Sequence, residues 1–210
     1  LGLVFLLCIP SACGLVVLGR PIISVIYERG RFTSLDTEQA GAALAFYAIG
    51  LAGYAAIKVL APAFYALNDA RTPMMISLIS IATNYTFNYL LVRKFGFGHR
   101  GLALSTSLVA LFNFFALLVL MRRKVERVEG RQILNSLIKI GAASSVMSVA
   151  CFFSYEALTE LIGSRGLSIQ LANALIPVIA GVIVFFMACR LLRVAELEMA
   201  VRAARRIIGR

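Results

Sequence analysis

The sequence has 210 residues, of which 60% are hydrophobic and only 15% are charged, and its mean hydropathy is +0.89. Soluble domains average roughly half apolar and a quarter charged residues, so this composition excludes an ordinary water-soluble domain. The net charge of +11 does not indicate nucleic-acid binding, because most basic residues lie in short segments between apolar blocks and no nucleic-acid-binding motif accompanies them.

Apolar blocks of about 20 residues recur along the chain, and a helix of that length crosses a ~30 Å hydrocarbon core. The blocks are apolar on all sides, which is typical of membrane-spanning helices, whereas the strands of a β-barrel would alternate. We therefore predict an all-α polytopic membrane protein with six transmembrane helices. In chain order the predicted spans are 1–18, 39–61, 73–92, 101–121, 133–155 and 169–192.

The first block opens the sequence without an initiator Met or a preceding basic segment, so we expect the chain to be the C-terminal part of a longer protein. Before the second block, Thr33 and Asp36 have the spacing of a capping box. Before the third, Thr72 followed by Pro73 predicts a helix that starts with Thr72 as its N-cap.

The basic residues of the connectors fall unevenly on the two sides of the membrane. One side carries Arg71, Arg122, Arg123, Lys124, Arg127, Arg131, Arg190, Arg193, Arg202, Arg205, Arg206 and Arg210. The other carries Arg20, Arg29, Arg31, Arg93, Lys94, Arg100 and Arg165. The positive-inside rule predicts that the first side, which includes the C-terminus, is cytoplasmic. After the last span, residues 193–210 predict a basic amphipathic helix on the anionic inner leaflet, with a partner-binding tail as the alternative.

Two cations lie inside predicted spans, Lys58 and Lys139, and intramembrane charges are candidates for function. Lys58 is about one turn before Pro62, where we expect its span to end, and Lys139 is near the basic connector at 122–131. Either ammonium group therefore has two explanations. It faces a cavity and meets an anionic substrate, or it snorkels to the membrane surface.

Asn84 and Asn88 are four residues apart, so their amides share one face of the third span. They are either interhelical hydrogen-bonding groups or oxygen ligands for a small hard cation such as Na⁺. In the loop before the second span, Arg29 and Arg31 are either solvated charges or a phosphate-binding pair. The four cysteines lie in apolar blocks without CxxC spacing, and no hydrolase, metalloprotease or P-loop motif occurs, so we expect no enzyme and no resident cofactor.

Several segments together resemble the MurJ (MviN) family of lipid II flippases, within the MOP transporter superfamily. They are Pro10 in the first span, GRPII before YERGRFT, KVLAPAFYALNDARTP, and the GLALSTS segment that follows Gly98. The likeness is specific as far as about Leu120. It implies a 14-helix fold in which the six spans are the ninth to fourteenth helices: 1–121 would hold four helices of the C-terminal lobe, and 133–192 two additional helices that form a lipid-tail groove.

The resemblance also implies the activity, which is flipping of undecaprenyl-diphosphate-linked peptidoglycan precursor to the outer leaflet by alternating access. Such a protein is a monomer in the bacterial inner membrane, driven by membrane potential or an ion gradient. Lys58, Arg29 and Arg31 then fall where the family has basic residues near the substrate. Asn84, Asn88 and Thr106 match the family's sodium-site positions, although Asn88 is an Asp in some members.

Three alternatives stay open at this point. A polysaccharide-unit flippase or a drug/cation antiporter would share the superfamily fold, although the spans lack the acidic residues that would favour an ion-coupled antiporter. A scaffold for cell-wall assembly would lack transport altogether. A membrane enzyme would need catalytic residues outside this sequence.

Overall fold

The computed structural model describes residues 1–28, 32–125, 130–163 and 166–208, and within these ranges it contains helices and no strand. The elements are α1 (Gly2–Tyr27), α2 (Ser34–Ala66), α3 (Arg71–Asn88), the π-helical turns η1 (Tyr89–Lys94), α4 (Gly98–Lys124), α5 (Gly130–Ile162), α6 (Leu167–Leu191) and α7 (Ala195–Ile208). Six candidate spans, with α3 and η1 forming one of them, are long and apolar enough to cross a membrane. The predicted fold class is confirmed.

The capping box before α2 is confirmed. The backbone N–H of Thr33 donates to the Asp36 carboxylate at 2.9 Å, and the N–H of Asp36 donates to the Thr33 hydroxyl at 3.4 Å. Because this box fixes the start of α2 at Ser34, the helix begins five residues before the predicted span at Gln39. The box satisfies backbone donors that would otherwise have no partner in the first turn.

The prediction that Thr72 is the N-cap of the third span is wrong, because α3 begins at Arg71 and is preceded by Ala70. Asp69 takes the capping role instead: its carboxylate accepts a hydrogen bond from the Thr72 N–H at 3.1 Å and another from the Thr72 hydroxyl. The same carboxylate pairs with Lys124 at the end of α4. Lys124 and Thr72 together hold the pKa of Asp69 well below its ordinary range, so the turn keeps a negative charge that joins two helix ends.

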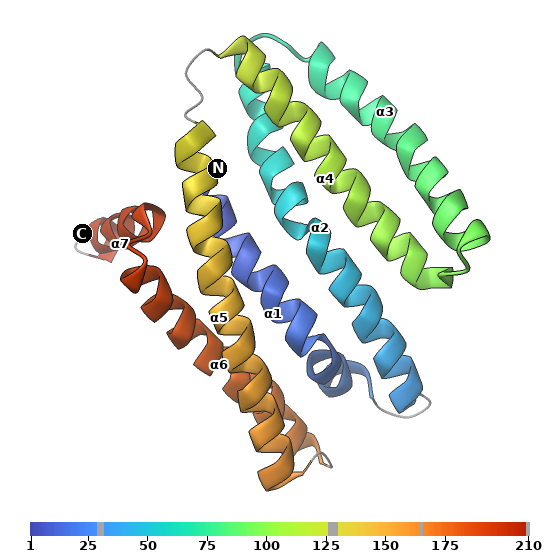
Figure 1. Cartoon of the computed structure of the whole chain (residues 1–210), viewed down its shortest axis with the longest axis vertical. Helices are drawn as coiled ribbons and strands as arrows, with labels where there is room; N and C mark the ends of the chain where they lie inside the picture. The colour runs from blue at the N-terminus through green and yellow to red at the C-terminus, as the bar shows by residue number, and fades with distance from the viewer. Residues whose placement is uncertain (29–31, 126–129, 164–165, 209–210) are drawn as a thin grey trace.

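The helices form a row in which α3 contacts α4, α4 contacts α2, and α2 contacts α1 (Figure 1). The pair α5 and α6 packs against the other side of α1. A buried core runs through the row and includes Phe5, Phe64 and Leu117, with the rings of Phe5 and Phe114 meeting edge to face at 5.7 Å. Grouping into residues 1–121 and 133–192 stays a prediction.

Small residues bring α2 and α4 close together. The Ser107 hydroxyl donates to the Phe46 carbonyl oxygen at 2.6 Å. A Cβ added at Gly50 would lie 2.7 Å from the Ser107 Cα, and one added at Gly53 would lie 3.1 Å from the Ala110 backbone. Small residues that permit close backbone approach are typical of helix pairs in membranes.

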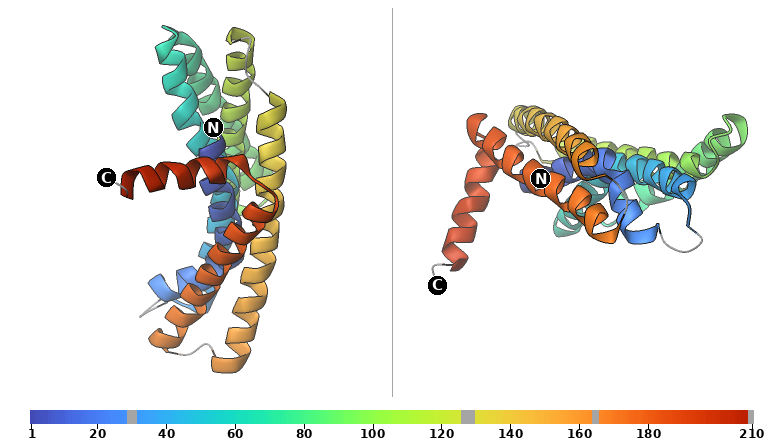
Figure 2. Two further views of the ribbon diagram at one scale, coloured as in Figure 1. Left: turned by 90° about the vertical axis from the view of Figure 1, so that its left-hand side faces the viewer. Right: turned by 90° about the horizontal axis from the view of Figure 1, so that it is seen from below.

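The predicted C-terminal helix is present as α7, which leaves the bundle across its long axis (Figure 2). Val194 and Leu197 are buried where α7 departs from α6. The ammonium group of Lys139 donates to the Arg193 carbonyl oxygen at this corner, at 3.5 Å. This contact supports an anchoring role for Lys139, whereas the position of α7 on a membrane surface stays a prediction.

Candidate functional site: a polar face on the second helix

Lys58 lies farther from the end of its helix than the sequence suggests. The helix α2 continues through Pro62, where the span was expected to end, to Ala66. Lys58 is therefore eight residues from the last residue of the helix, or about 12 Å at 1.5 Å per residue. Its side chain is exposed.

Three tyrosines share the face of α2 that carries Lys58. At 100° per residue, Tyr47, Tyr54, Lys58 and Tyr65 fall within a sector of about 40°. All four side chains are exposed, and the exposed fractions of Tyr47, Tyr54 and Tyr65 are 48%, 44% and 55%. Elsewhere on α2, Ala56 and Phe64 are completely buried against the bundle. We call these four residues the tyrosine–lysine face.

The depth of this face argues against contact with lipid tails. With 33 residues, α2 is about 50 Å long and exceeds the ~30 Å hydrocarbon core. Tyr47 and Tyr54 flank the middle of the helix and so lie at the level of that core. Phenolic hydroxyls and an ammonium group are costly in hydrocarbon unless they meet polar partners or water. The face therefore suits a polar cavity or a polar surface of another part of the protein.

The sequence reasoning identified Lys58 but missed the tyrosines. Tyr47 and Tyr54 lie 11 and four residues before Lys58, and Tyr65 lies seven residues after it. Residues four, seven or 11 apart lie on the same side of a helix. A helical projection of the second span would have found Tyr47 and Tyr54, whereas Tyr65 lies beyond the predicted end of that span. Chemically, the face offers one cation, three hydroxyls and aromatic surface, which suits a ligand with anionic and hydroxyl groups.

Asn84 and Asn88 do come together, and they form part of an interhelical chain. The Asn88 side-chain N–H donates to the Asn84 oxygen at 2.8 Å, and the Ser105 hydroxyl of α4 donates to the Asn88 oxygen. Both amide oxygens thus accept hydrogen bonds from protein groups. This is the arrangement that the hydrogen-bonding hypothesis predicts.

Thr106, the third residue of the predicted sodium site, directs its hydroxyl to its own helix and donates to the Leu102 carbonyl oxygen at 2.7 Å. The α4 residue that contacts the asparagine pair is its neighbour Ser105, whose hydroxyl donates to Asn88. Within the described ranges, no group of three or more His, Cys, Asp or Glu side chains gathers as metal ligands. The sodium site, which would use amide and hydroxyl oxygens, stays a prediction.

Arg29 and Arg31 lie outside the described residues. The loop that contains them is bounded by Tyr27 and Phe32, whose ring centroids are 5.9 Å apart. That contact brings together the two described ends of the loop. The role of the two arginines stays a prediction.

An apolar groove of about 510 Å³ lies on another side of the bundle, between α1, α5, α6 and the start of α7. Its lining includes Leu15, Met147, Val182 and Phe186. The groove has the apolar walls that a hydrocarbon chain requires. It therefore provides a second candidate surface, of different chemistry from the tyrosine–lysine face.

The fold and these two surfaces define a class, a multi-pass helical membrane protein with a polar face on one span and an apolar groove beside another. Within that class the chain belongs to the family described as "Lipid II flippase MurJ", whose model matches residues 1–172. The resemblance found in the sequence is confirmed.

Curated relatives agree with this assignment. A probable lipid II flippase MurJ from Rickettsia prowazekii is 32% identical over 193 residues, covering 92% of this chain and 38% of the relative. The protein of the same description from Vibrio cholerae is 39% identical over 111 residues, covering 53% and 21%. The lipid II flippase MurJ from Burkholderia cenocepacia is 36% identical over 124 residues, covering 59% and 24%. The chain thus spans roughly a fifth to two fifths of these relatives.

A solved structure described as a lipid II flippase MurJ in an inward closed conformation matches the fold. Its TM-score is 0.70 with 24% sequence identity, and the match covers 89% of this chain and 36% of that chain. At this identity the match supports the arrangement of helices and no finer property.

Proposed function

We propose that the protein containing this chain is a lipid II flippase of the bacterial inner membrane. It moves the undecaprenyl-diphosphate-linked peptidoglycan precursor from the inner to the outer leaflet by alternating access. Family membership supports the substrate, and the relatives' greater length supports a second lobe outside this chain. The observation that carries the proposal is the exposed tyrosine–lysine face, of which Tyr47 and Tyr54 flank the middle of α2.

In this proposal the tyrosine–lysine face lines a central polar cavity shared with the missing lobe. The Lys58 ammonium group pairs with the diphosphate of the substrate, because a charge-assisted hydrogen bond is about twice as strong as a neutral one. The hydroxyls of Tyr47, Tyr54 and Tyr65 bind sugar or peptide groups, and their rings provide stacking surface. Rocking of the lobes about this site would expose it to each side of the membrane in turn.

The apolar groove and the loop before α2 also have roles in this proposal. The apolar groove between α1, α5 and α6 holds the isoprenoid tail, which stays in hydrocarbon while the headgroup crosses. Arg29 and Arg31 would attract the diphosphate sugar at the outer mouth. The C-terminus is cytoplasmic, the protein works as a monomer, and the driving force is membrane potential or a sodium gradient.

The test is replacement of Lys58 in the full-length protein, with cellular complementation and the sidedness of lipid II as measurements. We expect Lys58→Gln to reduce flipping by about tenfold or more, since removing a hydrogen bond to a charged group costs about 1.5–3 kcal/mol. Lys58→Arg should retain more activity, and the membrane level of both variants should equal that of the parent.

Lys139→Gln serves as the matched control, because this ammonium group contacts the α6–α7 corner and lies away from the tyrosine–lysine face. Full activity of Lys58→Gln would contradict this role and support the alternative that Lys58 snorkels to the membrane surface. Depletion of the full-length protein should make lipid II accumulate on the inner leaflet. Unchanged sidedness would instead support a scaffold or a transporter of another substrate.

A further inference from the structure

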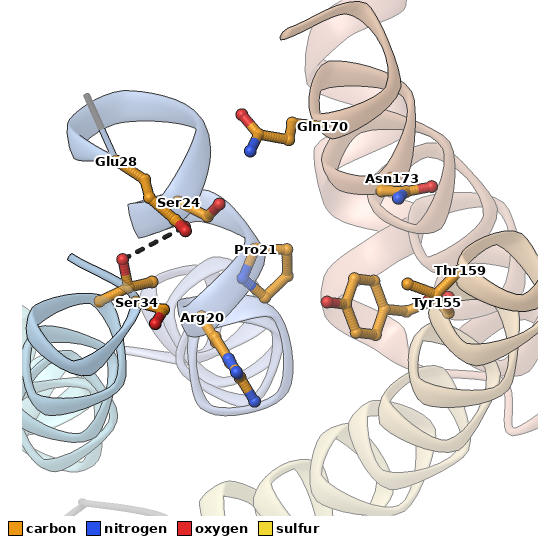
Figure 3. A pocket seen from close by; sticks show the side chains of 10 residues that line it. Arg20, Pro21, Ser24, Glu28, Ser34, Tyr155, Thr159, Gln170 and Asn173 are labelled. Atoms are coloured by element: carbon orange, nitrogen blue, oxygen red, sulfur yellow. Dashed lines mark hydrogen bonds between the residues drawn. The ribbon is translucent and has the colours of Figure 1, made fainter. Parts of the chain in front are cut away.

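Two cavities with polar linings lie at opposite ends of α6. The first, which we call the polar cavity, measures about 400 Å³, and Figure 3 shows Glu28 of α1 and Asn173 of α6 on opposite sides of it. Asn173 donates to the Gly163 carbonyl oxygen at 2.9 Å, and Glu28 accepts a hydrogen bond from Thr37 at 3.3 Å. Since Glu28 and Arg20 in this lining carry opposite charges, the polar cavity shows no preference for an anion or a cation.

The second cavity does have such a preference. It measures about 670 Å³ and lies at the corner where α6 ends and α7 begins, and we call it the corner cavity. Its charged lining residues are Arg190, Arg193, Arg202 and Glu198, all of them exposed. Three positive groups and one negative group leave a net charge of +2, so the corner cavity favours an anion.

Two of the three guanidinium groups are available to that anion. Arg202 pairs with Glu198 at 3.0 Å, whereas Arg190 and Arg193 form no ion pair with another described residue. Arg193 has a left-handed backbone with φ 49°, and its carbonyl oxygen accepts a hydrogen bond from Lys139. This turn keeps both arginines at the end of α6. A guanidinium group binds phosphate through two parallel hydrogen bonds, so the pair suits a phosphate.

The same cavity has an apolar wall on α6. Ile183 and Met187 belong to its lining, lie about one turn apart and are 55% and 62% exposed. Arg190 follows Ile183 by seven residues, so it lies on the same side of α6 and nearer to the helix end. Neither Ile183 nor Met187 lines the apolar groove. The corner cavity by itself therefore offers apolar contacts within the span and guanidinium groups at its end, which is the pattern that an acidic lipid requires.

Glu198 narrows the chemistry of that lipid. Its carboxylate keeps lone pairs beyond the one that Arg202 uses, so it can accept a hydrogen bond from a hydroxyl group. A second phosphate in the cavity would instead be repelled by this carboxylate. The charges thus fit a lipid that has one phosphate and a hydroxyl donor in its headgroup, and phosphatidylglycerol has this form.

We infer that the corner cavity binds phosphatidylglycerol from the leaflet at this end of the bundle. The phosphate pairs with Arg190 and Arg193, a glycerol hydroxyl donates to Glu198, and an acyl chain lies along Ile183 and Met187. Basic pockets beside transmembrane helices are known binding sites for acidic headgroups. Such binding requires only that the bundle spans a membrane, and it does not depend on the flipping activity proposed above.

The experiment titrates the full-length protein in detergent with phosphatidylglycerol, phosphatidylcholine or phosphatidylmethanol of identical acyl chains, and native mass spectrometry counts the lipids bound. Phosphatidylmethanol has the same charge and phosphate as phosphatidylglycerol but no headgroup hydroxyl, so it isolates the contact with Glu198. At one site we expect phosphatidylglycerol to bind about tenfold more tightly than phosphatidylcholine and about fivefold more tightly than phosphatidylmethanol. Undecaprenyl diphosphate at the same concentration should not displace it.

The variants Arg190→Gln and Arg193→Gln should each weaken phosphatidylglycerol binding by about tenfold, since each loses a hydrogen bond to a charged group. Glu198→Ala should make phosphatidylglycerol and phosphatidylmethanol bind equally. Arg123→Gln is the matched control, because Arg123 is an exposed arginine at the end of α4 and does not line the corner cavity. Lys58→Gln should also leave this binding unchanged, which separates the site from the proposed substrate site.

Four results would overturn the inference. An equal loss in Arg123→Gln would mean that basic residues attract the lipid without a defined site. Unchanged binding in both Arg190→Gln and Arg193→Gln would place the lipid elsewhere. Equal binding of phosphatidylglycerol and phosphatidylmethanol to the parent would remove the role of Glu198, and displacement by undecaprenyl diphosphate would mean that the cavity accepts a second phosphate.

Discussion

The amide of Asn88 connects two helices through both of its polar atoms, to Asn84 on its own helix and to Ser105 on α4. We expect Asn88→Ala to lower the free energy of unfolding by about 0.6 kcal/mol and at most about 1.7 kcal/mol, the range measured for such bonds in membranes. Thermal unfolding of the full-length protein should show the same loss in NaCl and in KCl, because the amide oxygens are engaged by protein donors.

Thr86→Ala is the control for this substitution, since its hydroxyl donates to Ala82 of the same helix and joins no second element. A parent protein that is stabilised by Na⁺ but not by K⁺, with the effect abolished in Asn88→Ala, would contradict the expectation. That result would support the predicted sodium site of Asn84, Asn88 and Thr106.

Residue patterns that act within one helix were predictable from the sequence. The Thr33–Asp36 capping box and the shared face of Asn84 and Asn88 follow from spacing alone. The Asp69–Thr72 cap is also local and was missed, whereas the pairing of Asp69 with Lys124, 55 residues along the chain, has no local pattern. Likewise the polar cavity draws residues from four helices, and no local pattern indicates that Glu28 and Asn173 line one space.

At the scale of elements, the distance between α2 and α4 depends on the absence of side chains at Gly50 and Gly53. Alanine normally stabilises a helix relative to glycine by up to about 1 kcal/mol. At Gly50 this gain is outweighed, because the added Cβ would lie 2.7 Å from the Ser107 Cα, a backbone atom that cannot move alone. We expect Gly50→Ala to destabilise the full-length protein by about 1–3 kcal/mol, the usual cost of overpacking.

Gly141→Ala in α5 is the matched substitution, since nothing lies within 4 Å of a Cβ at that position. It should leave the thermal midpoint unchanged or raise it slightly, whereas Gly50→Ala should lower it. If both substitutions raise the midpoint equally, the close approach of α2 and α4 does not limit packing in the native protein.

At the scale of the whole molecule, the number and order of the spans were predictable because each is a continuous apolar block. The least buried of the six is the candidate span 71–94, which contacts α4 and only sparsely α2. Its other sides are left for lipid or for the rest of a longer protein. A single sequence does not reveal that asymmetry directly, because lipid tails are as apolar as the large side chains that pack between helices.

The orientation of the bundle is a property of the whole molecule that the helices alone do not fix, and it follows from the distribution of basic residues. It predicts that the α2–α3 turn is cytoplasmic and that the turn before α4 is outside, because the span 71–94 separates them. Leu67 and Phe97 mark these turns and expose 48% and 46% of their surface. A cysteine introduced at either position would therefore be accessible to a thiol reagent.

In intact spheroplasts, a membrane-impermeant maleimide should label Phe97→Cys and should label Leu67→Cys only after permeabilisation. The parent protein measures the background from Cys8, Cys13, Cys151 and Cys189, none of which is fully exposed. The reverse labelling pattern would mean that the bundle has the opposite orientation, with the C-terminus outside. Labelling of both variants in intact spheroplasts would mean that residues 71–94 do not cross the membrane. The predicted pattern requires one crossing between the two turns and a cytoplasmic side that carries the larger positive charge.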